Sequence, residues 1–505
     1  MTTKSRTEQE RTGLKRIRTE HIIVLLIFLL VLGMRIFFSL NSGLDYQAYN
    51  TLRQAEHIKA TGTPLFSDPL SYQGRTAVFP PLFYYLIAGI SVLIPLQIAA
   101  KIISCISISS LVIIVYLITR HMTKNKTASI IASLFSGLVP VTYTLLNKAS
   151  PYSLALPLIF LLSYAYMRIT EKRYASTSII LSIILLLTNA SVLIILLSFL
   201  LYFLIIKLEK RKIMPREVEV GVFLFFLALW FNILMYKKAF FTHGIRFVWQ
   251  NTPLSMLSAY FQELSFLGVI HAVGFVPLLL GVYAAYHIFF KTKNKNASLY
   301  ISFLIISFVM LWLRLIPFNA GLLLLSTNLI ILSSYSIKIL LVSISKTKIR
   351  WVAKPVLAIL VLVFLLTTII SAAPYLGVDA PAKADLEALE WIKNNTLENT
   401  VILGRIKEGH LISFAAHRKN VADTNFLLIK NIDQRYADVS HLYTSRFKSE
   451  AVRLINEYNI DYILLSAQAS QEYKIESLYY ADQECFKLVY EQEAKIYKFL
   501  KCKIE

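Results

Sequence analysis

Residues 21–81 read HIIVLLIFLLVLGMRIFFSL and then NSGLDYQAYNTLRQAEHIKATGTPLFSDPLSYQGRTAVFPP. The first run, 21–40, is predominantly apolar and, at about 1.5 Å per residue, long enough to cross the roughly 30 Å hydrocarbon core of a bilayer. The second run, 41–81, is polar and lies directly after that boundary. Ionisable groups kept near hydrocarbon usually have a functional reason. We therefore expect the functional site on the polar run.

The composition is that of a polytopic membrane protein. The chain of 505 residues is 56% apolar and 16% charged, whereas soluble domains carry roughly 25% charged residues. A further apolar run, 80–95, is only about 24 Å long as a helix and is too short for a full crossing. Runs of suitable length predict eleven spans: 21–40, 98–119, 128–146, 151–169, 175–190, 191–207, 219–236, 264–289, 298–316, 319–341 and 353–374.

The formal charge of +22 is concentrated in the predicted membrane part. The first 374 residues hold 35 Lys and Arg against 11 Asp and Glu, while the rest of the chain holds 17 against 19. The basic residues cluster in short loops, which is typical of cytoplasmic loops and not of a nucleic-acid-binding face. If 80–95 does not cross, all the basic clusters share one side, namely 1–20, 120–126, 170–174, 207–216, 291–295 and 346–354.

The common side of the basic clusters predicts the topology of the chain. Residues 1–20 form a cytoplasmic basic tail, residues 21–374 form the transmembrane domain, and 41–97 is its first external loop. Residues 80–95 are expected to be juxtamembrane or re-entrant on the outer face. The part from 375 to 505 is expected to be extracytoplasmic.

The C-terminal part changes from long apolar runs to short, alternating elements. Periodicity predicts helices in ADLEALEWIKNNT and SEAVRLINEYN, strands in NTVILG and IDYILLSA, and a closing hairpin in CFKLVYEQEAKIYKFL. Residues 375–505 therefore read as an α/β domain. Cys485 and Cys502 could form a disulfide if this domain is extracytoplasmic.

Asp45 has two interpretations. It could be the N-cap of a helix over 46–62, or a general base or metal ligand at the membrane surface. On that helix Asp45, Tyr49, Arg53 and Glu56 recur on one face, as in an interfacial amphipathic helix. His57 is either an ordinary residue of the polar face or a ligand.

The first external loop contains a series of short motifs in a fixed order. They are Asp45 next to a tyrosine, Gly62-Thr63-Pro64, Ser67-Asp68-Pro69-Leu70, Gly74-Arg75 and Pro80-Pro81-Leu82-Phe83-Tyr84-Tyr85-Leu86. In this layout the loop resembles that of GT-C glycosyltransferases. Within that superfamily the loop is most similar to the protein O-mannosyltransferase and lipid A aminoarabinose transferase branch. The resemblance implies transfer of a sugar from a polyprenyl-phosphate donor to an acceptor outside the cytoplasm, with Asp45 as the catalytic base. The branch often has Glu after this Asp, where this chain has Tyr46.

On this reading we predict the remaining site residues. Asp68 would assist Asp45 or bind a divalent metal such as Mg or Mn, and Tyr46, Glu56 and His57 would contact the substrate. Arg314 and Arg75 would neutralise the donor phosphate. Arg314 could instead reach to the membrane interface without a ligand.

Two further segments bear on the substrates. Residues 388–426 resemble the segment of oligosaccharyltransferase catalytic subunits around their Trp-Trp-Asp-Tyr-Gly motif, but here Gly404-Arg405-Ile406-Lys407-Glu408 replaces the motif. Because that motif reads the hydroxyl residue of the sequon, its loss argues against an Asn-X-Ser/Thr acceptor. The loop 237–263 could close over the donor or act as an interfacial anchor.

The sequence therefore favours a membrane glycosyltransferase that uses a polyprenyl-phosphate sugar and a protein, lipid or glycan acceptor. A transporter or lipid-linked-glycan flippase is the alternative, since it too has many spans. The predicted spans hold no acidic residue except Glu219 at the very start of one of them, which argues against a substrate path at the midplane. A receptor or assembly scaffold is a third option.

Overall fold

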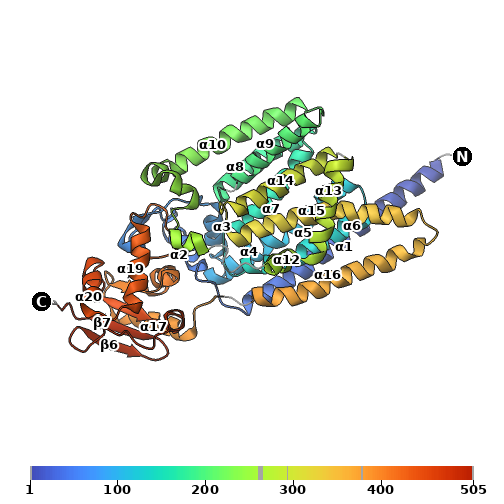
Figure 1. Ribbon diagram of the computed structural model, residues 1–505. Coiled ribbons are helices and arrows are strands. Elements are labelled where there is room, and N and C mark those ends of the chain that lie inside the picture. The colour runs from blue at the N-terminus through green and yellow to red at the C-terminus, as the bar shows by residue number, and fades with distance from the viewer. Residues whose placement is uncertain (1–2, 191, 260–265, 293, 377–378, 503–505) are drawn as a thin grey trace.

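The computed structural model describes residues 3–190, 192–259, 266–292, 294–376 and 379–502 (Figure 1). Long helices form one end of the molecule, and a small sheet with short helices forms the other. The two chain termini lie at opposite ends. Helices α2 and α3 lie where the two parts meet, so the first external loop lies at their junction.

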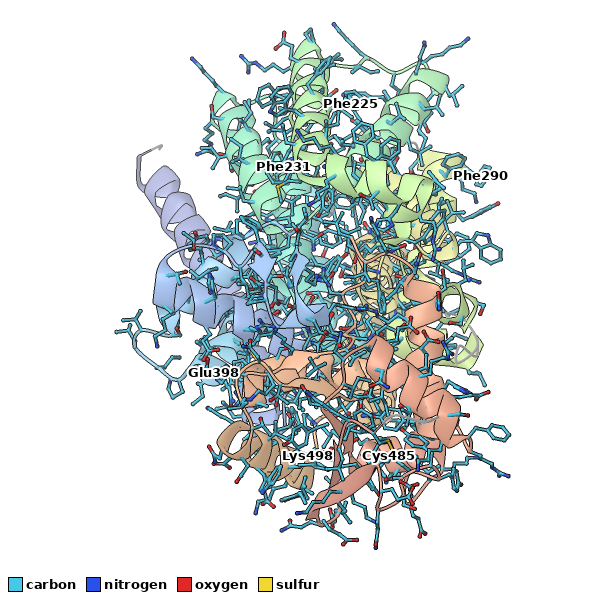
Figure 2. All side chains as sticks on the ribbon, turned by 90° about the vertical axis from the view of Figure 1, so that its left-hand side faces the viewer. Phe225, Phe231, Phe290, Glu398, Cys485 and Lys498 are labelled. Carbon is cyan, nitrogen blue, oxygen red and sulfur yellow. A yellow bond between two sulfur atoms is a disulfide. The ribbon has the colours of Figure 1, made fainter. Side chains whose placement is uncertain are left out.

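Seven helical segments are long and apolar enough to cross a membrane, and the chain is a multi-pass membrane protein. These segments are Thr19–Leu40, Leu96–Thr123, Pro215–Ser258, Phe275–Thr292, Lys295–Trp312, Phe318–Ser345 and Arg350–Ala372. Phe225 and Phe290 are exposed on this part, as expected for side chains that face lipid (Figure 2). The apolar helices Lys126–Leu138, Tyr152–Met167 and Val192–Leu208 are shorter.

The eleven predicted spans all coincide with helices in the described residues, but several helices are shorter than predicted. The predicted span 128–146 is interrupted at Pro140, where α6 gives way to a 3₁₀ turn. The predicted span 264–289 breaks at Gly274, whose φ is 89°, and its residues 264–265 lie outside the described part. The helices of the membrane part are α1 Thr3–Leu40, α4 Leu96–Ser109, α5 Leu111–Thr123, α6 Lys126–Leu138, α7 Tyr152–Met167, α8 Lys172–Thr188, α9 Val192–Leu208, α10 Pro215–His243, α12 Phe266–Val273, α13 Phe275–His287, α14 Lys295–Trp312, α15 Phe318–Ser345 and α16 Ala353–Leu376.

Helix α15 lies in the core of the membrane part. It packs against α5, α6, α13 and α14, and most of its residues between Ala320 and Ile337 are buried. Helix α1 begins at Thr3, so the predicted basic tail is helical. Arg35 in α1 is fully buried and donates hydrogen bonds to Ser109 Oγ at 3.1 Å and to the Gly137 carbonyl at 2.7 Å. These bonds attach α1 to α4 and α6.

The predicted juxtamembrane element is the short helix α3, Leu82–Ile90. Its nine residues span about 14 Å at 1.5 Å per residue, which is less than half a bilayer core. It packs against α2, Ala48–Thr61, and α4. A helix of this length is too short to cross the membrane by itself, and the juxtamembrane position of 80–95 stays a prediction.

The C-terminal part contains a five-stranded sheet in the order β4-β3-β5-β7-β6. Its centre, β5, is buried at all four residues, as predicted for IDYILLSA. The predicted helices, strands and hairpin are confirmed, whereas β4, α19 and α21 were not predicted. The elements are α17 Lys383–Asn395, β3 Val401–Leu403, α18 Gly409–Leu411, β4 Lys419–Asn420, α19 Ile432–Thr444, α20 Lys448–Glu457, β5 Tyr462–Leu465, α21 Ala467–Tyr473, β6 Phe486–Glu491 and β7 Lys495–Phe499.

A disulfide joins Cys485 to Cys502 and closes the terminal hairpin (Figure 2). The bonded cysteines are 17 residues apart, and a loop of that length stabilises the folded chain by about 3 kcal/mol in the chain-entropy model. We expect reductant to lower the thermal unfolding midpoint of the detergent-solubilised protein. In the variant Cys485→Ser/Cys502→Ser, reductant should change nothing, and an equal shift in both proteins would contradict a stabilising disulfide.

Candidate functional site

Asp45 lies in the turn between the end of α1 and the start of α2. Its Oδ1 accepts a hydrogen bond from the Gln47 N–H at 2.9 Å, and its own N–H donates to the Asn147 carbonyl at 3.0 Å. The helix begins at Ala48 with Gln47 as its N-cap, so the predicted role of Asp45 as the N-cap is wrong. The carboxylate instead closes an Asx turn that enters the helix.

The segment before α7 holds this turn from the other side. Asn147 accepts a hydrogen bond from Ser39 Oγ at 2.8 Å and donates one to Ser42 Oγ at 2.7 Å. The next residue, Lys148, places its Nζ 3.9 Å from Asp45 Oδ2. Asn147 therefore fixes the shape of the turn, and Lys148 places a positive charge beside Asp45.

The C-terminal part contributes a second charged pair. Lys407 Nζ lies 3.3 Å from Asp379 Oδ2, and both side chains are about half exposed.

Burial raises the pKa of Asp45, and the charge of Asp379 raises it further, whereas Lys148, the Gln47 N–H and Lys407 oppose the shift. A carboxylate with a raised pKa is a better proton acceptor than an ordinary aspartate.

Tyr46 is buried against the segment 404–408. The Arg405 guanidinium lies 5.6 Å from the centre of its ring and donates hydrogen bonds to Glu408, Gln468 and Glu472. Burial raises the pKa of the Tyr46 hydroxyl. Within the described part of the chain this hydroxyl has no hydrogen-bond partner. An unpaired buried hydroxyl is costly, which makes Tyr46 suitable for a polar contact with a substrate.

Sequence analysis did not identify Asn147, Lys148, Arg405 or Lys407 as site residues. For Arg405 and Lys407 a signal existed, because they lie at the place of the missing oligosaccharyltransferase motif. Asn147 and Lys148 had no comparable local pattern. The pairing of Asp45 with Lys148 joins residues more than 100 positions apart.

Asp68 contacts residues of α2 and of its own loop. It pairs with Arg53, and its Oδ1 also accepts the N–H groups of Leu70 at 2.9 Å and Ser71 at 3.1 Å. These bonds close the turn after the Asp-Pro pair. The role of Asp68 as an assisting carboxylate or metal ligand stays a prediction, and its contacts favour a role in shaping the loop.

Arg75 belongs to the first external loop and is buried against the C-terminal part. It donates to the carbonyls of Asn425 and Leu427, the latter at 3.2 Å, and its Nη1 lies 3.7 Å from Asp423 Oδ1. Asp423 also accepts a hydrogen bond from Ser71 Oγ at 2.5 Å. Phosphate binding by Arg75 stays a prediction, and its contacts favour a role in attaching the loop.

Helix α2 is not the predicted interfacial helix. Tyr49 and Arg53 on its polar face are buried, because the Phe414 ring lies 5.6 Å from that of Tyr49 and Asp68 pairs with Arg53. Glu56 is exposed and His57 is half-buried. They lie more than two turns beyond the start of α2, about 12 Å from it along the axis. Their predicted contact with the substrate is not tested.

The loop 237–263 contacts the C-terminal part, and its residues 260–263 lie outside the described residues. Arg246 Nη1 lies 2.8 Å from Asp433 Oδ2, and Asn251 donates to the carbonyls of Phe426 and Ile429. Two smaller elements, η3 Gly244–Trp249 and α11 Leu254–Ala259, form this docked segment. The sequence left two roles open for this loop, which are closing over the donor and anchoring at the interface. These contacts indicate a third role, which is to hold the C-terminal part.

Arg314 follows α14 and lies against the same loop. Its guanidinium donates to the Leu257 carbonyl, and Trp249 Nε1 donates to the Leu313 carbonyl at 3.0 Å. Arg314 therefore links the segment after α14 to the loop 237–263. Its role as a phosphate ligand stays a prediction.

The residues around Asp45 do not fit a divalent metal. No group of three or more His, Cys, Asp or Glu that could hold one occurs among the described residues. One oxygen of Asp45 accepts the Gln47 N–H, and the other faces the Lys148 ammonium, which repels a metal.

Comparison with known proteins shows which solved structures have a similar fold. No family model and no curated protein matches the sequence. The archaeal oligosaccharyltransferase AglB from Archaeoglobus fulgidus, in complex with an inhibitory peptide and a dolichol-phosphate, is similar with a TM-score of 0.68 and 15% identity over 89% of this chain and 69% of that chain. A crystal structure of the same oligosaccharyltransferase in complex with Zn and sulfate has a TM-score of 0.64 and 16% identity over 88% and 67%.

A second neighbour matches over nearly its full length. ArnT from Cupriavidus metallidurans, bound to undecaprenyl phosphate, is similar with a TM-score of 0.56 and 12% identity, covering 96% of this chain and 98% of that chain. AglB and ArnT are both GT-C glycosyltransferases. The helical membrane part with its C-terminal α/β part therefore has the GT-C fold.

Proposed function

We propose that this protein is a membrane glycosyltransferase that moves a sugar from a polyprenyl-phosphate donor to an acceptor outside the cytoplasm. The observation that carries the proposal is the placement of Asp45. Its carboxylate is buried, has a raised pKa, and is held at the outer end of α1 where the membrane helices meet the C-terminal part. The similarity to AglB bound to dolichol-phosphate and to ArnT bound to undecaprenyl phosphate supports the donor class.

In the proposed reaction Asp45 accepts a proton from the acceptor as the acceptor atom attacks the anomeric carbon of the sugar. The bond between that carbon and the phosphate oxygen breaks, and its electron pair leaves with the polyprenyl phosphate. Negative charge therefore develops on the phosphate, and nearby cations stabilise the transition state. Because the donor set around Asp45 does not fit Mg or Mn, the proposal includes no metal.

The orientation is part of the proposal. The basic loops support a cytoplasmic N-terminus. The disulfide between Cys485 and Cys502 supports an oxidising, extracytoplasmic location for the C-terminal part. The absence of the Trp-Trp-Asp-Tyr-Gly motif at 404–408 supports an acceptor other than an Asn-X-Ser/Thr peptide.

Mass spectrometry of lipid-linked sugars and surface glycans in a strain without the gene tests this function. We expect a polyprenyl-phosphate sugar to accumulate and a surface glycan or glycosylated product to be lost. Wild-type protein should restore both pools. No change in either pool would contradict the transferase and favour a transporter, flippase or scaffold.

A further inference from the structure

The leaving phosphate of the proposed reaction needs a cation beside Asp45, and the described residues offer no acidic cluster for a metal. Lys148 is the cation that pairs with Asp45 in the structure, with its Nζ 3.9 Å from Asp45 Oδ2. We propose that the Lys148 ammonium binds the phosphate of the donor in place of a divalent metal. This inference rests on the proposed function and adds to it the residue that binds the donor phosphate and the absence of a metal requirement.

The position of Lys148 is fixed by the structure around it. Asn147 beside it is buried and bonded to Ser39 and Ser42, so the backbone cannot shift away from the turn. Ala149 on the other side is fully buried. The Lys148 side chain itself is 25% exposed, which leaves it accessible to a ligand from the membrane surface.

The distance between Lys148 and Asp45 shows that no direct hydrogen bond joins the two groups. A direct hydrogen bond between an ammonium and a carboxylate is about 2.7–2.9 Å long, whereas these atoms are 3.9 Å apart. Within the described part of the chain, Lys148 pairs with Asp45 alone. At least two of the three N–H donors of the Lys148 ammonium are therefore available. A phosphate oxygen can accept them while Asp45 remains within reach of the acceptor.

The alternative is that Lys148 serves only as the counter-ion of the buried Asp45. Two other lysines near the turn differ from it in this respect. Lys407 is paired with Asp379, with its Nζ 3.3 Å from Asp379 Oδ2. Lys101 Nζ donates to the carbonyls of Ser39 and Ser42 at 2.8 and 2.6 Å, so its donors are engaged in holding the turn. Lys148 has a charged partner at a longer distance and remains free to bind an anion. This difference assigns phosphate binding to Lys148.

The charge balance of the step is complete without a metal. Asp45 takes up the acceptor proton, and the phosphate leaves with the electron pair of the broken bond. The Lys148 ammonium keeps its proton throughout and pairs with the added negative charge. It needs no further reactant.

Binding of undecaprenyl phosphate to the purified full chain in detergent and excess chelator tests the proposal. We expect wild-type protein to bind, Lys148→Ala to bind at least 10-fold more weakly, and Lys148→Arg to bind within about threefold of wild type, because Arg keeps the charge. Lys383→Ala is the matched control, because Lys383 is 91% exposed and lies on α17. Inorganic phosphate at the same concentration should bind more weakly than the lipid.

Three results would overturn the inference: unchanged binding by a folded Lys148→Ala variant, binding by the wild type only after Mn²⁺ is added, or equal affinity for inorganic phosphate. Thermal unfolding shows whether Lys148→Ala is folded, and Lys148→Met replaces it if it is not. Sugar transfer that needs Mn²⁺ would refute the inference and leave the proposed function intact. Phosphate binding that depends on Lys148, without sugar transfer in the presence of donor and acceptor, would refute only the function.

Discussion

Asp45→Asn should lose sugar transfer by a factor of about 10² to 10⁴, the usual contribution of a general base. Asparagine has nearly the same shape and its side-chain oxygen can still accept the Gln47 N–H, so the turn should persist. It cannot take up the acceptor proton. The measurement is the initial rate of transfer by purified protein, with the thermal unfolding midpoint recorded alongside.

The pH profile gives this prediction a second readout. Since burial raises the pKa of Asp45, the wild-type rate should rise with pH as Asp45 loses its proton, with a midpoint above the range of an ordinary aspartate. Asp45→Asn should abolish this rise.

Glu398→Gln is the matched control for Asp45→Asn. It removes a carboxylate charge at an exposed position of the C-terminal part (Figure 2). Its rate and pH profile should equal those of the wild type. An Asp45→Asn variant that transfers sugar at the wild-type rate would exclude Asp45 as the base.

Arg75→Ala should lower the stability of the full chain by about 1–3 kcal/mol, because it leaves buried carbonyls without their donor and removes a cation from beside the buried Asp423, which keeps its contacts with His410, Ser71 and Asn425. Asp423, which faces Arg75 at 3.7 Å, is fully buried. The same change removes hydrogen bonds to the carbonyls of Asn425 and Leu427. Thermal or denaturant unfolding of the protein in detergent measures the loss.

This variant also separates the two roles considered for Arg75. An arginine that attaches the loop changes the unfolding midpoint, whereas one that binds the donor phosphate changes the affinity for undecaprenyl phosphate at constant stability. Arg453→Ala provides the control, since Arg453 is 69% exposed and its ion pair among the described residues is with Glu457 one turn away. Unchanged stability with weakened lipid binding in Arg75→Ala would restore the phosphate role.

The sequence by itself determined the features that depend on local composition and periodicity. Long apolar runs predicted the membrane helices, and the length of 80–95 predicted the short helix α3. A short, continuous apolar run predicted the buried central strand β5, and the pattern of 485–500 predicted the closing hairpin. Asp45 was identified because it follows the first span directly, which requires no knowledge of distant contacts.

Only the tertiary structure decided which charged residues meet at the site. Lys148 reaches Asp45 from the segment before α7, and Arg405 reaches Tyr46 from the C-terminal part. Asp68 and Arg75 have the same charges that made them candidates, but their nearest charged partners are Arg53 and Asp423. The charge of a side chain is a property of the sequence, whereas the partner that neutralises it can come from a distant segment, as Asp423 does for Arg75, and no local pattern encodes such a contact.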